Sequence, residues 1–116
     1  HTKEYLITNG IDVEAGLKFL GDMEMYDDTV KDFIDTINER ISKLTAYKNS
    51  QDMTNYSVEV HALKSDSKYL GFVKLAELAL NHELKSKEND FEYVQANFET
   101  LINEANRIIT IIKKYM

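Results

Sequence analysis

The sequence contains no cysteine and no proline, and only four glycines among its 116 residues. Without cysteine the chain forms no disulfides and no thiolate metal sites, which suits a reducing compartment. Without proline, no helix is kinked by a missing backbone N–H. No apolar run approaches the roughly 20 residues that cross a bilayer, and no signal-peptide pattern precedes the domain. These absences favour a cytoplasmic location.

Positive charge is also scarce, because 14 lysines and arginines stand against 20 aspartates and glutamates, for a net charge of −6. Nucleic acids and anionic membrane surfaces bind basic faces, so we expect contact with neither. A chain of this length supports one modest hydrophobic core but not two. We therefore predict a single domain over residues 1–116.

Apolar residues recur at three- and four-residue steps, and no stretch alternates with period two, which predicts helices and no sheet. Residues 1–9 carry little signal. A short helix is predicted from Asp12 to Leu20, capped by Asp12 and ended near Gly21. A long helix follows from about Met23 to Lys48.

The second half of the chain predicts three further helices. After a polar break at residues 49–52, one helix runs to Leu70 and is ended by Gly71, a structural residue that takes a left-handed conformation. The next helix is predicted over Phe72–Ser86. Asn89-x-x-Glu92 then resembles a capping box before the last and most regular helix. Four long helices with short breaks predict an all-α fold, an antiparallel up-down four-helix bundle with a short extra N-terminal helix.

His61 stands out on the helix that ends at Leu70. Successive helical residues turn by about 100°, and this count puts four residues on one core-facing stripe: Tyr56, Val60, Leu63 and Leu70. His61 points roughly 130–140° away from that stripe. Lys64 lies about one turn away on the same face and Lys68 about two.

The same count leaves His61 without a carboxylate, because Glu59 and Asp66 point toward the flanks of the helix. A neutral imidazole in solvent is a nucleophile, and a phosphoryl group added to it would find Lys64 as a close counter-charge. The alternative is a solvated helix face that happens to carry a histidine. Geometry alone leaves both interpretations open.

The residues around His61 resemble the signature of histidine-containing phosphotransfer (HPt) domains, H-x-L-K-G-x-A/S-x-x-L-G-x-x-x-L. The matching positions read His61-x-Leu63-Lys64-Ser65-x-Ser67-x-x-Leu70-Gly71-x-x-x-Leu75. Ala79 and Glu83 also fall where the family pattern has a small residue and an acid, and Gly10–Leu17 resembles the N-terminal piece of many bacterial HPt domains. Ser65 replaces the usual glycine, and His82 stands where leucine is common.

This resemblance implies a phosphorelay intermediate that accepts a phosphoryl group on His61 Nε2, with Lys64 stabilising the phosphate. The implied partners are receiver domains of response regulators or hybrid sensor kinases, which supply the acidic pocket and Mg²⁺. No glycine-rich phosphate loop is present, so we expect a phosphocarrier without a kinase site, and no cofactor.

A docking strip is predicted beside the imidazole. Ala62 and Ser65 lie on one side of His61, and Val58 and Tyr69 continue the strip along the helix. We expect the Asp12–Leu20 helix to cover Val58 and Tyr69. The predicted partner contacts are Ala62, Ser65, Lys68, Val13 and Leu17.

The sequence also raises three other interpretations. A di-iron bundle needs an acid three residues before each histidine, but Val58 and Ala79 stand there, so we predict no metal site and a core role for His82. A bundle that binds partners without carrying phosphate is a second alternative. The third is the phosphoacceptor domain of a chemotaxis-type histidine kinase.

Overall fold

The computed structural model describes all 116 residues as helices and short connections, without strands. Its six helices are α1 (Lys3–Thr8), α2 (Val13–Leu20), α3 (Met23–Asn49), α4 (Met53–Leu70), α5 (Val73–Lys87) and α6 (Phe91–Tyr115). The prediction of an all-α chain is confirmed. Helix α1 falls in a segment for which the pattern predicts nothing. None of the six helices combines the length and apolarity needed to cross a membrane.

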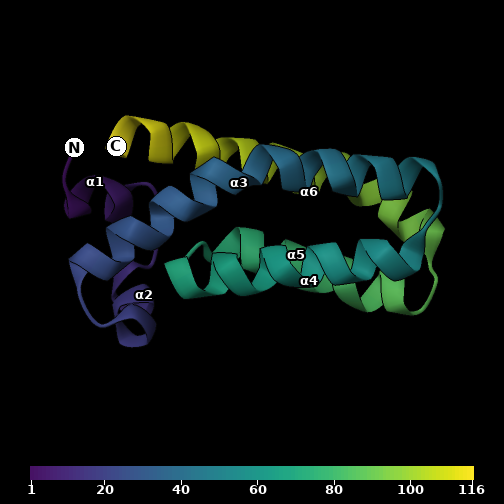
Figure 1. Cartoon of the computed structure of the whole chain (residues 1–116), viewed down its shortest axis with the longest axis horizontal. Helices are drawn as coiled ribbons and strands as arrows, with labels where there is room; N and C mark the ends of the chain where they lie inside the picture. The colour runs from purple at the N-terminus through teal and green to yellow at the C-terminus, as the bar shows by residue number, and fades with distance from the viewer.

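The four long helices, α3 to α6, lie along the 40 Å axis of the molecule (Figure 1). Helix α4 packs against α5 and α3, and α6 packs against α5 and α3. Both short helices lie at the end of the molecule that holds the two termini (Figure 1). There α1 packs against α6 and α2, while α2 packs against α3 and α4.

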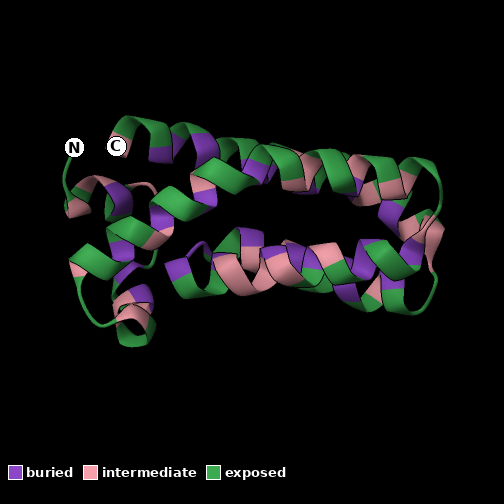
Figure 2. Ribbon diagram, viewed as in Figure 1, coloured by how far each residue is buried: buried purple, intermediate pink, exposed green.

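Each long helix turns one apolar face inward, and the buried positions follow the three- and four-residue steps of the sequence (Figure 2). The predicted stripe of α4 is fully buried. Its counterparts on α3 and α6 are Tyr26, Val30, Phe33, Ile37, Leu44, Val94, Phe98, Leu101, Ala105, Ile108 and Ile112. The regular spacing of these residues is therefore explained by one shared core.

Aspartate side chains cap four of the helices. Asp12, Asp22, Asp52 and Asp90 each accept a hydrogen bond from the backbone N–H three residues further on. The predicted capping box at Asn89 is wrong. Asn89 has a left-handed backbone with φ of 58°, whereas a residue that caps a helix is usually extended, and Asp90 caps α6 instead.

Gly71 ends α4 and joins it to α2. Its φ of 78° is left-handed, and its carbonyl oxygen accepts a 2.9 Å hydrogen bond from Asp12 N. A Cβ on Gly71 would lie 2.0 Å from Asp12 O, so only glycine fits here. The Tyr26 hydroxyl donates a 2.6 Å hydrogen bond to the neighbouring Leu70 carbonyl. The start of α2 is thereby held against the end of α4.

Candidate functional site

His61 projects from α4 on the side opposite its buried stripe. Its side chain is 54% exposed, while Tyr56, Val60 and Leu63 are fully buried. This is the orientation that the helical count predicts.

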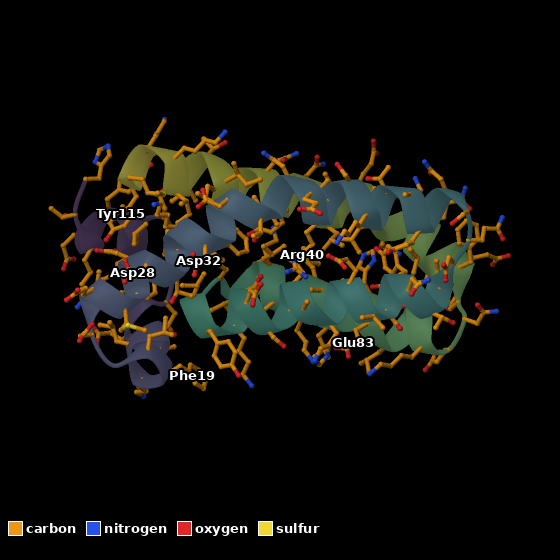
Figure 3. The ribbon with its side chains drawn as sticks, in the orientation of Figure 1. Phe19, Asp28, Asp32, Arg40, Glu83 and Tyr115 are labelled. Atoms are coloured by element: carbon orange, nitrogen blue, oxygen red, sulfur yellow. The ribbon has the colours of Figure 1, made fainter.

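A carboxylate on the neighbouring helix contacts His61. Glu83 Oε2 lies 2.7 Å from His61 Nδ1, and Glu83 is only 2% exposed. Figure 3 labels Glu83 on the side of the molecule where α4 and α5 lie together. The expectation that no carboxylate lies near His61 is wrong. A count along one helix does not include side chains that enter from the next helix.

Two lysines flank Glu83. Lys64 Nζ lies 2.7 Å from Glu83 Oε1, and Lys87 Nζ lies 2.8 Å from Glu83 Oε2. Oε1 has no well-aligned hydrogen-bond donor, so the charge of Lys64 compensates it. Burial alone would raise the pKa of Glu83, but the contacts with Lys64, Lys87 and His61 outweigh burial and lower that pKa to about 2. Glu83 is therefore a carboxylate at neutral pH.

A charged carboxylate can only accept a hydrogen bond, so His61 Nδ1 must be the donor. In a neutral ring this places the proton on Nδ1 and leaves the Nε2 lone pair free. Nε2 makes no hydrogen bond. A nucleophilic atom oriented through the other ring nitrogen is the arrangement expected of an activated imidazole.

The predicted partner contacts are distributed differently from the expectation. Lys68 is exposed, and Ala62, Ser65 and Leu17 are half-buried. Val13 is only 1% exposed, so the prediction that it contacts a partner is wrong. It follows Asp12, which is held against Gly71, and this contact brings Val13 into the core.

The expectation that α2 covers Val58 and Tyr69 is also wrong, because Val58 is 66% exposed and Tyr69 46%. Helix α2 packs at the Gly71 end of α4, so it reaches Tyr69 only from the side. There Phe19 meets the Tyr69 ring edge-on, with centroids 5.1 Å apart. Val58 lies three turns away from this contact. The strip of Val58, Ala62, Ser65 and Tyr69 is thus open beside His61, with Phe19 extending it.

Lys87 and Phe19 are site residues that the sequence interpretation missed. Lys87 lies outside the HPt-like signature, and its only signal is the four-residue step from Glu83, a common spacing for helical ion pairs. Phe19 reads as a core residue at helical spacing, yet it is exposed.

His82 is a core residue, as predicted. Its Nδ1 accepts a 2.8 Å hydrogen bond from the Tyr56 hydroxyl, and its Nε2 donates to the Asn97 carbonyl at 3.2 Å. Burial lowers the pKa of His82, and the bond to Asn97 opposes part of that effect. Because both of its ring nitrogens are hydrogen-bonded, His82 links α4, α5 and α6 inside the core. No group of three or more histidine, aspartate or glutamate side chains is placed to hold a metal ion.

A family model for the Hpt domain matches residues 28–110. The chain therefore belongs to the Hpt domain family, whose members are phosphocarriers that transfer phosphoryl groups on histidine and interact with receiver domains in two-component systems. The matched segment includes His61, Lys64, Glu83 and Lys87 and excludes α1 and α2. Searches of curated proteins and of solved structures each found no match.

Proposed function

We propose that this chain is a phosphorelay intermediate. His61 accepts a phosphoryl group from the aspartyl phosphate of one receiver domain and passes it to the aspartate of another. The observation that carries the proposal is the hydrogen bond from His61 Nδ1 to the Glu83 carboxylate, which leaves Nε2 free on an exposed ring. Family membership supplies the reaction class.

The transfer needs no atom beyond the two partners. The Nε2 lone pair attacks phosphorus, the P–O bond to the donor aspartate breaks, and its electron pair stays on the released carboxylate. The phosphorylated ring keeps its Nδ1–H on Glu83. In the second step an acceptor carboxylate oxygen attacks phosphorus, and the N–P bond breaks. The ring gains positive charge in the first step, and Glu83 stabilises that charge. In the second step the electron pair of the N–P bond returns to Nε2, and the ring becomes neutral again.

The receiver is proposed to dock on the open strip beside His61, at Ala62 and Ser65, with Lys68 and Leu17 at the edges. Two features support this surface. Its two ends, Val58 and Tyr69, are exposed apolar side chains on the helix that carries the reactive group, and the lysines nearby complement the acidic pocket that receiver domains present. The packing of α3 to α6 supports an antiparallel up-down bundle as the platform, within a single domain over residues 1–116. A cytoplasmic location is part of this proposal.

The test is incubation with a panel of phosphorylated receiver domains from the same genome. The wild-type chain should gain an acid-labile, alkali-stable label, and His61→Gln should gain none while its helicity is unchanged. Glu88→Gln, an exposed change just after the end of α5, is the matched control and should label normally. A bundle that only binds partners would not be labelled by any receiver. Persistent labelling of His61→Gln would contradict the assignment of His61.

A further inference from the structure

A hollow of about 250 Å³ lies beside the His61 ring. Its lining residues are Ser57, Val58, His61, Glu83 and Lys87. Lys64 is not among them. It lines a separate groove between α4 and α5, together with Lys68, Ala76, Glu77 and Leu80. The space next to the imidazole therefore opens toward Lys87.

Lys87 is the only lysine or arginine that lines this hollow. Its Nζ contacts Glu83 Oε2, the same oxygen that accepts the hydrogen bond from His61 Nδ1. The Lys87 ammonium group is therefore no farther from His61 Nδ1 than the sum of these two contacts. Nε2 belongs to the same five-membered ring, so it lies only one ring width beyond Nδ1. The Ser57 hydroxyl is engaged by the Thr54 carbonyl at 2.8 Å, so it has no proton left to donate to a ligand in the hollow.

We propose that the phosphoryl group on Nε2 occupies this hollow and that Lys87, rather than Lys64, is its principal counter-charge. This inference rests on the proposed function and adds a phosphate-binding residue outside the HPt-like signature. It departs from the sequence-based interpretation, which gives that role to Lys64.

The charges around Glu83 give the physical reason. A phosphoryl dianion placed near a buried carboxylate is repelled unless a cation lies between them. Lys87 has a long side chain that is 59% exposed, so it can turn from Glu83 toward phosphate oxygens. Lys64 is only 24% exposed and holds Oε1. It is better placed to keep Glu83 compensated when Lys87 turns away.

The experiment compares four proteins after phosphorylation with phosphoramidate: wild type, Lys87→Ala, Lys64→Ala and Lys85→Ala. Lys85 is the matched control, because it lies on the same helix but pairs with Glu88 and sits over the Tyr93 ring. The ³¹P resonance of the phosphohistidine is followed through a pH titration. A nearby ammonium lowers the second pKa of the phosphoryl group, an effect that a merely structural lysine would not produce.

We expect Lys87→Ala to raise the phosphoryl pKa and to lower the phosphorylated fraction at equilibrium with a receiver by roughly five- to tenfold at low ionic strength. Lys87→Arg should restore both, and Lys85→Ala should match wild type. A Lys87→Ala protein that titrates like Lys85→Ala would overturn the inference while leaving the proposed function intact. A larger pKa change in Lys64→Ala would also overturn it, by placing the phosphate on the other side of the ring. If wild type accepted no phosphoryl group from phosphoramidate or any receiver, the proposed function itself would fail.

Discussion

His61 Nδ1 and Glu83 Oε2 lie 2.7 Å apart across the contact between α4 and α5. The histidine is mostly exposed, and its partner is almost fully buried. A buried carboxylate normally pays a large desolvation cost, but Lys64 and Lys87 compensate Glu83 from its two oxygens. The pair therefore joins a reactive surface group to a fixed internal anchor, which restrains the ring and selects the nitrogen that carries the proton.

Replacing this anchor should slow phosphoryl transfer. Glu83→Ala removes the acceptor for Nδ1–H, so the ring loses its orientation and its proton moves between the two nitrogens. A charge-assisted hydrogen bond contributes about 1.5–3 kcal/mol, and exposure of His61 reduces that value, so we expect phosphorylation by phosphoramidate to slow by roughly five- to tenfold. A time course followed by ³¹P NMR measures the rate. Glu88→Ala, just after the end of α5 and without a contact to the ring, should leave the rate unchanged.

The low pKa of Glu83 also predicts how stability depends on pH. Its pKa is about 2 in the folded protein, against an ordinary value of 4.5. A carboxyl group with a lowered folded pKa stabilises the fold above the unfolded pKa, and this contribution is lost as pH falls through the folded pKa. Wild type should therefore be more stable than Glu83→Gln at pH 7, by about 1–3 kcal/mol.

That difference should shrink steadily between about pH 4.5 and pH 2 as the wild-type carboxylate takes up its proton. Urea unfolding at a series of pH values measures it. A gap between the two proteins that stayed constant down to pH 2 would show that the glutamine destabilises through packing rather than through the lost charge.

Gly71→Ala should be strongly destabilising. The new Cβ would lie 2.0 Å from the Asp12 carbonyl oxygen, and the left-handed backbone adds strain of its own. We expect a loss of roughly 2 kcal/mol or more in the free energy of unfolding, because neither backbone segment can move away without breaking the Asp12–Gly71 hydrogen bond. Gly10→Ala is the control. Gly10 is also left-handed, but no atom lies within 4 Å of its would-be Cβ, so it should lose only the backbone term.

The helices could be predicted because periodic burial and end signals are local properties of the chain. Leu44 and Ile112 each belong to a series of apolar residues that recurs at helical spacing. Asp22 marks a helix start through its side chain, and Gly71 marks a helix end because it has none. Residues 3–8 form α1 although they bury only Leu6. One inward residue produces no period, so this helix depends on contacts with α6 and α2 that no local pattern reveals.

Only part of the site could be predicted from the sequence, because part of it depends on contacts between helices. The direction of His61 follows from α4 alone. Its contact with Glu83, and the position of Lys87 in the hollow, depend on how α5 is rotated against α4. Val13 is predicted to contact a partner, but it is buried. Its burial results from the hydrogen bond between Asp12 and Gly71, which lie far apart in the sequence.

Ser65→Glu tests the docking strip. Ser65 is half-buried on the strip of Val58, Ala62 and Tyr69, beside the imidazole but outside its contacts with Glu83. A glutamate there obstructs an approaching domain and repels its acidic pocket. We expect phosphoryl transfer from a receiver to fall by at least about tenfold, since a like-charge contact in an interface costs several kcal/mol. Phosphorylation by the small donor phosphoramidate should stay close to the wild-type rate.

The ratio of the two rates is the decisive measurement, because it separates approach to the histidine from the reactivity of the histidine. Gln95→Glu makes the same charge change at an exposed position on α6, so it controls for the more negative net charge and should leave both rates unchanged. If Ser65→Glu slowed both donors equally, the substitution would have disturbed His61 itself, and the docking strip would have to be placed elsewhere. A selective loss with the receiver alone would locate the docking surface on the face of α4 that carries Val58 and Ala62.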